Sequence, residues 1–290
     1  EHPSLAWLEL VWKWINENFP RNLAEFEGMP LIPVETSSMA RISQDSTIIV
    51  GKHPLCNETL THLVHQLLIK SDCIVIKKLS SFAKHDQLFN YVALPNPLGI
   101  LRILSVARKK VFQQLTLASN KVKEELCSIL SRLEGIDLSQ KSFIRTLPIF
   151  KALDGSHFAS CQAERGEQRL VAPRNLLIPA ECRIIDRTNI LSSSKDESYR
   201  LMQKLDMRIE STAGLIRSHL ENFLNSTIKN AEKDNLVLWI LEKIDVLLEE
   251  MSTFVTFMRD QACIPTRSGK RMAPNKLFDD SDKLLIRLLQ

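Results

Sequence analysis

The amino-acid sequence predicts an α+β fold that is predominantly helical, with helices packed on short mixed strand hairpins. One observation is the last third of the chain, where no glycine or proline occurs between Gly214 and Pro265 and apolar residues recur at helical spacing. Another is a series of short β-branched runs beside prolines, which is typical of edge or irregular strands. In addition, a helical pattern leads repeatedly into an apolar–proline strand, which indicates degenerate helix–hairpin repeats. These strands are Leu31–Pro33, Leu147–Phe150 and Cys263–Pro265.

The first half of the chain alternates predicted helices with short strands. Ser4 can cap the first helix, and Pro20 lies just beyond its end. Asn96 followed by Pro97 marks another helix start, because proline suits the first helical position. The expected elements, in order, are a helix over 4–19, strands at 29–34 and 47–50, a helix over 59–69, a strand at 73–76, and helices over 96–117, 119–135 and 139–146.

The second half is expected to become more helical after a region of short strands and loops. That region runs from 147 to 185, and the polar, serine-rich stretch Thr188–Ser194 is the best linker candidate. The expected elements after it are a helix around 215–224, a longer helix over 237–258 broken near Ser252, a strand at 263–266, and a final helix capped by Asp280 or Ser281. We therefore predict an α+β subdomain over 1–187 and a mostly helical subdomain over 188–290, which ends in a short hairpin and helix.

Composition argues against the common nucleotide-binding and catalytic classes. The chain has 290 residues, 44% of them hydrophobic and 25% charged, which are ordinary values for a globular protein. Its 8 glycines never stand at the spacings of G-x-G-x-x-G or of the phosphate loop G-x-x-x-x-G-K. No H-E-x-x-H and no G-x-S-x-G occur either. We therefore expect no enzyme activity and no cofactor.

Charge, cysteine content and hydropathy favour a cytoplasmic protein. The net charge of +4 is too mild to call for nucleic acid or an anionic membrane, and no apolar run approaches the roughly 20 residues that span a bilayer. The 6 cysteines include no C-x-x-C pair, so free thiols in a reducing compartment are expected. The chain begins at Glu1 without methionine, which suggests a piece of something longer, although a cleaved leader would leave the same start.

Two groups of residues superficially match hydrolase sites. Ser192-x-x-Lys195 has the spacing of a serine acylase, but the other motifs of such enzymes are missing. Asp154, Ser156 and His157 supply the residue types of a catalytic triad. Neighbours in one turn cannot generally point at one reacting atom, so we interpret them as turn residues.

A metal site is the other candidate. His62 and His65 lie three residues apart on a predicted helix, with Cys56 and Cys73 on either side. Two of these four residues belong to other elements, and no C-x-x-C supports them. We expect no metal.

Basic residues form two clusters along the sequence, and these are the candidate partner-binding residues. They could be a solvated rim, or they could dock an acidic partner or nucleic acid. No aromatic residues interleave with them, which disfavours single-stranded nucleic acid. The residues are Arg165, Arg169, Arg174, Arg183, Arg187, Arg267, Lys270 and Arg271.

Three tryptophans near the N-terminus offer a different surface. Trp7, Trp12 and Trp14 could form a patch that binds unfolded clients. Large aromatics at helical spacing are more often core, and we expect them to be buried.

Two strings of residues resemble the sacsin family. Leu147-Pro-Ile-Phe150 with Asp154-Gly155 after it is similar to a recurring motif of that family. Cys263-Ile-Pro-Thr-Arg-Ser-Gly-Lys270, followed by Leu277-Phe278-Asp279, is similar to a second one, and Ala93–Gly99 has the same character. The resemblance covers the chain from about residue 90 to its end, and the first part follows by continuity.

The resemblance implies a segment of a very large cytosolic co-chaperone, outside its ATPase lobe of the GHKL type. That lobe's Asp-x-Gly-x-Gly nucleotide loop has no counterpart here, so the resemblance carries over no catalytic residue. The implied partners are neighbouring domains of the parent chain, protein clients, and co-chaperones such as the heat-shock chaperone system. Neither a membrane nor nucleic acid is expected as a partner.

These observations lead to a first hypothesis and two alternatives. The first is a non-catalytic scaffold that binds clients or partners in protein quality control. One alternative is a regulatory segment that completes a GHKL-type ATPase in trans through an arginine of the 165–187 cluster. The other is a nucleic-acid-binding module, which would show salt-dependent binding to a duplex.

Overall fold

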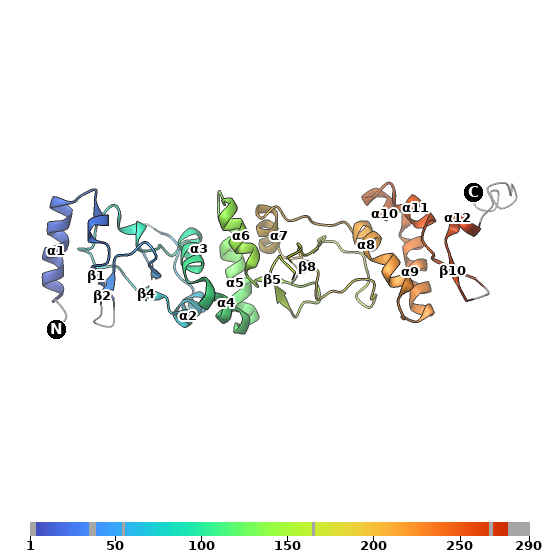
Figure 1. Ribbon diagram of the computed structural model, residues 1–290, viewed down its shortest axis with the longest axis horizontal. Helices are drawn as coiled ribbons and strands as arrows, with labels where there is room; N and C mark the ends of the chain where they lie inside the picture. The colour runs from blue at the N-terminus through green and yellow to red at the C-terminus, as the bar shows by residue number, and fades with distance from the viewer. Residues whose placement is uncertain (1–3, 35–38, 54–55, 164–165, 267–268, 278–290) are drawn as a thin grey trace. The chain divides into compact units, whose positions relative to one another are not determined.

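The computed structural model describes residues 4–34, 39–53, 56–163, 166–266 and 269–277, and the chain divides into two compact units (Figure 1). Unit 1 comprises Glu1–Lys151, Phe158–Glu167 and Glu197–Leu205, and unit 2 comprises Ala152–His157, Gln168–Asp196 and Asp206–Gln290. The boundary predicted between 187 and 188 lies inside a segment of unit 2. The division into subdomains over 1–187 and 188–290 stays a prediction.

Unit 1 combines helices with short two-stranded ladders. Its helices are α1 (Leu5–Asn18), α2 (His62–Lys70), α3 (Pro97–Val106), α4 (Arg108–Leu117), α5 (Asn120–Ser131), α6 (Leu138–Thr146) and most of α7 (Asp196–Lys204), with short 3-10 helices η1 (Leu23–Phe26) and η2 (Leu88–Asn90). Its strands are β1 (Pro30–Pro33), β2 (Met39–Arg41), β3 (Ile48–Val50), β4 (Ile74–Ile76), β5 (Phe150–Lys151) and β6 (Phe158–Ala159). The pairs β1–β2 and β5–β6 are antiparallel hairpins, whereas β3 and β4 run parallel.

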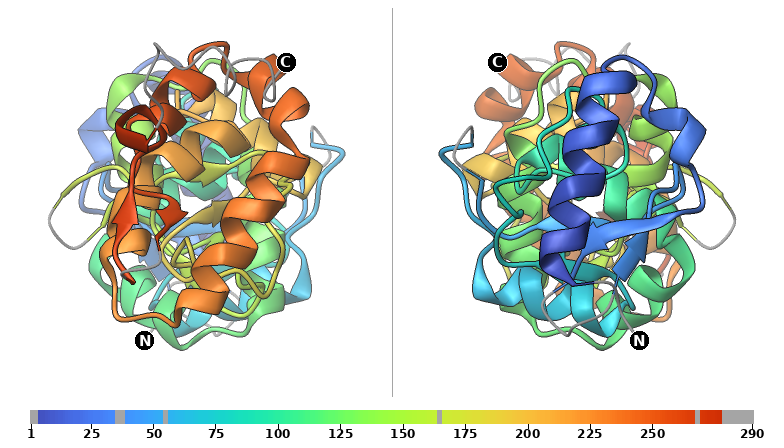
Figure 2. Two further views of the ribbon diagram at one scale, coloured as in Figure 1. Left: turned by 90° about the vertical axis from the view of Figure 1, so that its right-hand side faces the viewer. Right: turned by 90° about the vertical axis from the view of Figure 1, so that its left-hand side faces the viewer.

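One hydrophobic cluster of unit 1 forms where α1 lies over the β1–β2 hairpin (Figure 2, right). Leu8, Trp12 and Ile15 follow helical spacing and are fully buried. The indole Nε1 of Trp12 donates a 2.9 Å hydrogen bond to the carbonyl oxygen of Leu31, so the helix is tied to the strand by a polar contact as well. Burial of this stripe explains why a helix with no acidic residue in its first turn is held in place.

Unit 2 repeats the mixture of helices and short ladders. Its helices are α8 (Thr212–Asn225), α9 (Asn230–Glu242), α10 (Ile244–Glu250), α11 (Phe254–Arg259) and α12 (Pro274–Leu277), and its strands are β7 (Val171–Ala172), β8 (Leu191–Ser192), β9 (Ile264–Pro265) and β10 (Arg271–Met272). The β7–β8 pair is parallel, and β9–β10 is an antiparallel hairpin (red strands in Figure 2, left). Buried residues of α8, α10 and α11, among them Leu220, Leu247 and Phe254, share one hydrophobic cluster.

The structure confirms the α+β, predominantly helical fold class, but two of the strand predictions were incomplete. β1 pairs with β2, a segment that the sequence did not indicate, and β3 pairs in parallel with β4. The stretch Thr188–Ser194, predicted as a linker, instead contains β8. Leu191 and Ser193 are fully buried there, and the Ser193 hydroxyl donates a 2.7 Å hydrogen bond to the carbonyl of Ala172. Ser193 therefore provides a hydrogen bond to a buried backbone carbonyl and is not part of a solvent-exposed linker.

The long helices predicted over 96–117 and 237–258 are each divided. The first breaks at Ala107, and the second breaks at Lys243 and again after Glu250, earlier than the expected Ser252. No glycine or proline marks these breaks. In the second region, the separate short helices bring Ile240, Leu247 and Phe254 into the same core cluster. The final helix expected after Asp280 lies outside the described residues.

The helix predicted over 119–135 also ends early, as α5 at Ser131. Lys204 reaches this end from α7, and its Nζ donates hydrogen bonds to the carbonyls of Ser131 (2.8 Å) and Leu133 (2.5 Å). A cation at a helix C-terminus satisfies carbonyls that have no partner in the helix. A lysine more than 70 residues away in sequence therefore caps the end of α5, and Gly135, the predicted stop, lies beyond the last helical residue.

None of the helices that the structure describes has the length and apolar character to cross a bilayer. None of the six cysteines, Cys56, Cys73, Cys127, Cys161, Cys182 and Cys263, forms a disulfide.

Candidate functional site

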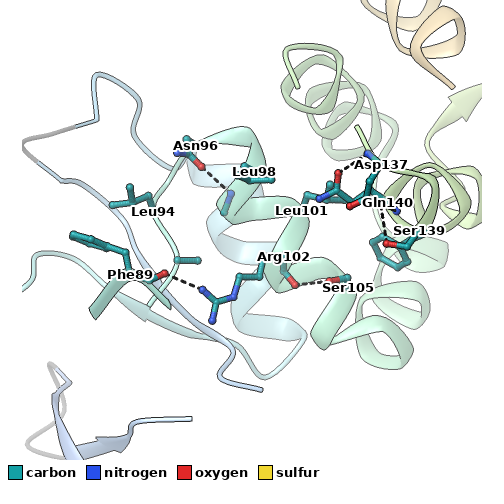
Figure 3. A pocket seen from close by; sticks show the side chains of 13 residues that line it. Phe89, Leu94, Asn96, Leu98, Leu101, Arg102, Ser105, Asp137, Ser139 and Gln140 are labelled. Carbon is teal, nitrogen blue, oxygen red and sulfur yellow. Dashed lines mark hydrogen bonds between the residues drawn. The ribbon is translucent and has the colours of Figure 1, made fainter. Parts of the chain in front are cut away.

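Unit 1 contains a hollow of about 490 Å³ between the first turns of α3 and α6 (Figure 3). The polar groups at these turns cap the two helices. The Asn96 side chain accepts a 2.7 Å hydrogen bond from the amide of Gly99. Asp137 and Gln140 form a capping box, in which the Asp137 carboxylate accepts a 2.8 Å bond from the Gln140 amide.

Arg102 is the cation that lines this hollow, and its guanidinium forms hydrogen bonds to the protein backbone. Its guanidinium donates to the carbonyls of Phe89, at 3.0 Å, and of Asn90 (Figure 3). Burial lowers the pKa of Arg102, but an arginine remains charged at any physiological pH. The Ser105 hydroxyl is bonded to the carbonyl of Arg102 at 2.8 Å. The polar groups of the hollow thus make hydrogen bonds within the protein itself.

The predicted basic cluster lies in unit 2 wherever it is described, and most of its members bond to the protein itself. Arg187 donates to the carbonyls of Ile178 (3.0 Å) and Pro179 (2.7 Å). Arg271 donates to the carbonyl of Cys263 at 2.7 Å and pairs with the carboxylate of Asp234, and its side chain is only 10% exposed.

The remaining members of the cluster divide into paired and exposed residues. Arg169 donates a 2.7 Å hydrogen bond to the side chain of Asn189, and Arg174 pairs with Asp196 at 2.8 Å. Arg183 and Lys270 are exposed, and the part of the chain that the structure describes offers their side chains no hydrogen bond or ion pair. Arg165 and Arg267 lie outside the described residues. The members of the cluster that the structure describes are therefore mainly structural, and Arg183 and Lys270 are the available cations among them.

The turn that holds Asp154, Ser156 and His157 brings the three side chains together without making a triad. Ser156 Oγ donates to the Asp154 carboxylate at 2.7 Å and lies 3.0 Å from His157 Nδ1, which also contacts that carboxylate. A triad needs the serine and the carboxylate on opposite ring nitrogens. Partial burial raises the pKa of Asp154, but the hydrogen bonds from His157 and Ser156 outweigh it and hold that pKa well below its usual range.

The predicted metal candidates do not come together as a site. Within the described ranges, no group of three or more histidine, cysteine, aspartate or glutamate residues could hold a metal ion. Cys73 is buried, and desolvation raises the pKa of its thiol to about 11. A thiol must lose its proton to bind metal strongly, so this environment disfavours Cys73 as a ligand. Ser192, the other candidate nucleophile, has its hydroxyl 2.9 Å from that of Ser194.

The tryptophan prediction was right for one residue and wrong for two. Trp12 is fully buried, whereas Trp7 and Trp14 are 49% and 50% exposed, and Leu10 between them is 66% exposed. These three residues follow helical spacing, so α1 carries an exposed apolar stripe beside its buried one. Helical periodicity placed the tryptophans on one helix, but it could not tell which side of that helix faces the core.

Two of three comparisons with known proteins found nothing: no family model and no solved structure matches. The third found one curated relative. The chain resembles human sacsin. The two are 25% identical over 296 aligned positions, which cover 98% of this chain and 6% of sacsin.

This match confirms the resemblance predicted from the sequence and extends it over the first ninety residues. In the structure, the strings that resemble sacsin lie on hairpins. Leu147–Phe150 enters β5 of the β5–β6 hairpin, and Cys263–Thr266 contains β9 of the β9–β10 hairpin. The Ala93–Gly99 string forms the bridge to β3 and the cap of α3. The recognisable residues are therefore those that turn the chain and start helices.

Proposed function

We propose that this chain is a non-catalytic, partner-binding scaffold segment of a large cytoplasmic chaperone-type protein. The similarity to sacsin along nearly the whole chain supports the protein class, although the chain spans only 6% of the relative's length. Six cysteines without a disulfide among them are typical of a reducing compartment. Polar groups that bond to one another around the hollow of unit 1 support binding rather than catalysis. Its partners in this proposal are neighbouring domains, clients and co-chaperones of the heat-shock system.

The exposed apolar stripe of α1, defined as Trp7, Leu10 and Trp14, is the observation that carries the proposal. The buried stripe on the same helix fixes α1 to the core, so the exposed one is presented on a rigid element. Trp14 is further held by Phe19 and Phe26, with ring centroids 5.2 and 6.2 Å away. Large aromatics at the surface are enriched in interfaces, because they bury much area for little lost side-chain freedom.

A chaperone assay tests this proposal with a matched pair of double variants. Trp7→Gln with Leu10→Gln removes most of the stripe and leaves Trp14 and its ring contacts in place. Leu238→Gln with Leu241→Gln makes the same i, i+3 change on α9, where these leucines are 59% and 54% exposed. The wild type should suppress aggregation of a heat-unfolded model protein, measured by light scattering. The α1 variant should lose most of this effect and the α9 variant should keep it.

Two results would count against the proposal. One is an α1 variant that protects as well as the wild type while remaining folded by circular dichroism. The other is ATP turnover by the purified chain, which would require a site that the proposal denies.

Arg183 keeps one alternative function open. It is the member of the 165–187 arginine cluster that is exposed and unpaired among the described residues, so it is the one that could reach the nucleotide of an ATPase in trans. In that case the chain should raise the ATP turnover of an isolated GHKL-type lobe, and Arg183→Ala should abolish the increase while Lys270→Ala does not. An unchanged rate with the wild-type chain would remove this alternative.

A further inference from the structure

Unit 2 contains a second hollow, of about 460 Å³, between the chain segment at 179–183 and the helices α8 and α9. Its floor is apolar and belongs to the core. Phe223 and Leu236 are 5% and 3% exposed, and Trp239 packs against the same hydrophobic cluster. A floor fixed in this way is a preformed surface rather than one that must be assembled when a ligand arrives.

The rim of this hollow carries two carboxylates that have no bonded partner in the part of the chain that the structure describes. Glu181 and Glu232 both line it, and no hydrogen bond or ion pair engages either carboxylate within the described residues. Desolvation is the main cause that raises the pKa of the nearby Cys182 thiol, and the charges of both glutamates raise it further. Both carboxylates therefore act on one point at the wall of the hollow, and the thiol there stays protonated and neutral.

The cations near this rim do not neutralise the negative charge of the two carboxylates. Arg187 lowers the pKa of the same thiol, but its Nη2 already donates to two backbone carbonyls. Arg183 also lines the hollow, where it is exposed and has no partner among the described residues. Two unpaired carboxylates against one unpaired guanidinium leave the hollow acidic.

We infer that this hollow binds a lysine or arginine side chain presented by an extended segment of a partner protein. Such side chains have an apolar stem and a cationic head. The stem would cover Phe223 and Leu236, the head would lie between Glu181 and Glu232, and the indole of Trp239 would add an attraction between cation and ring. The inference rests on the proposed function, because it names a partner chemistry for a partner-binding segment. It uses a different surface from the stripe of α1.

The probe is the amidated peptide acetyl-Ala-Leu-Lys-Leu-Ala. The control peptide replaces lysine with norleucine, which keeps the stem and lacks the ammonium group. Binding to the full chain is followed by the NMR signal of the Trp239 indole N–H, assigned with Trp239→Phe. The lysine peptide should shift this signal saturably, and the norleucine peptide should bind at least about tenfold more weakly, because one close charge pair is worth roughly that factor.

Variants of the charged rim residues should change the affinity for the lysine peptide in opposite directions. Glu181→Gln with Glu232→Gln should weaken the lysine peptide at least about tenfold, whereas Arg183→Ala should tighten it by roughly twofold or more, because a like charge is removed. The inference is overturned if the peptide does not bind, if the glutamine variant binds it equally, or if Arg183→Ala weakens it. Trp7→Gln with Leu10→Gln should leave peptide binding unchanged, so failure of the α1 stripe and failure of this hollow are distinguishable.

Discussion

The two units share a small arrangement of parallel strands. In unit 1 the buried strand β3 pairs in parallel with β4 and, through Ile49, with Ala93. In unit 2 the strand β7 pairs in parallel with β8 and, through Val171, with Ile209. A capped helix follows in both units. Asn96 caps the amide of Gly99 at the start of α3, and Ser211 caps the amide of Gly214 at the start of α8.

The two units differ in how tightly the capped turn is packed. A Cβ on Gly99 would lie 2.0 Å from the backbone carbonyl oxygen of Leu94. A Cβ on Gly214 would meet only the end of the Glu210 side chain, at 2.8 Å, and the Ser211 hydroxyl, at 3.3 Å. The same arrangement of strands and cap therefore demands glycine in unit 1 and merely accepts it in unit 2. The two capped turns therefore have a similar backbone but differ in which side chains they can accept. For this reason the two units need not share the same residues at the turn.

The largest expected effect comes from replacing these two glycines with alanine. Gly99→Ala should destabilise unit 1 by about 3 kcal/mol, because a backbone carbonyl cannot move aside without distorting the turn. Gly214→Ala should change stability by less than about 1 kcal/mol, because the Glu210 carboxylate can rotate away and alanine favours helix by about 1 kcal/mol over glycine. Urea unfolding followed by circular dichroism measures both. Equal losses would mean that the two turns are packed alike.

Lysines that cap helix ends provide the next comparison. Lys233 in unit 2 is 6% exposed and its Nζ donates to the carbonyls of Leu224 and Ser226, both at 2.6 Å, at the end of α8. Lys204 does the same for α5 in unit 1. Lys233→Met should cost about 2 kcal/mol, since it leaves carbonyls without a charged donor. Lys204→Met should cost somewhat less, because that side chain is less buried.

The exposed Lys229 supplies the control for the capping lysines. Lys229→Met should leave the thermal midpoint within about a degree of the wild type, since surface substitutions seldom matter. If Lys233→Met also left it unchanged, the buried ammonium would contribute nothing to the stability of unit 2.

A third comparison sets α1 against α5. α5 packs against α2, α3 and β5, and its buried residues, which include Lys123, Leu126 and Leu130, lie around most of the helix. α1 rests on its hairpin by one stripe and leaves the other exposed. Trp12→Phe should therefore destabilise unit 1 by about 1.5 kcal/mol, through loss of the bond to Leu31 and of packing.

The exposed side of α1 should be insensitive to the same kind of change. Trp7→Gln should shift the free energy of unfolding by less than about 0.5 kcal/mol, because no core contact is lost. Thermal melts of both variants decide the point. A large loss for Trp7→Gln would show that the stripe serves the fold rather than a partner.

These comparisons also explain how far the sequence could lead. Local signals were sufficient for the start of α3, which needs only Asn96 and Pro97, and for the existence of α6, predicted over 139–146. They were insufficient where a distant residue decides. The end of α5 is capped by Lys204, and the buried Leu191 lies in a strand that pairs with the distant β7.

The candidate sites were harder to predict, because a side chain can bind a partner only if it is not already bonded within the folded protein. Arg187 and Arg271 looked available in the sequence, yet both bond to backbone carbonyls. The hollow of unit 2 was missed because its residues come from segments about 40 to 60 positions apart, such as Glu181 and Trp239, and no local pattern joins them.

The smallest expected effect concerns two carboxylates that hold backbone amides, Asp137 in unit 1 and Asp154 in unit 2. Hydrogen bonds from the amide of Gln140 and from Ser139 lower the pKa of Asp137, which is fully exposed. The pKa of Asp154 is also lowered, and its side chain is only 17% exposed. A lowered pKa in the folded state stabilises the protein above the unfolded pKa near 4, and this contribution is lost as the pH falls.

Asp154→Asn should therefore cost about 1 kcal/mol at pH 7, and the difference from the wild type should shrink steadily as the pH is lowered from about 5 toward 2. Asp137→Asn should show the same trend with a smaller amplitude, because water screens an exposed carboxylate. Urea midpoints at pH 7 and pH 3 measure both variants. A difference for Asp154→Asn that stayed constant between these pH values would mean that the charge of Asp154 does not order the turn.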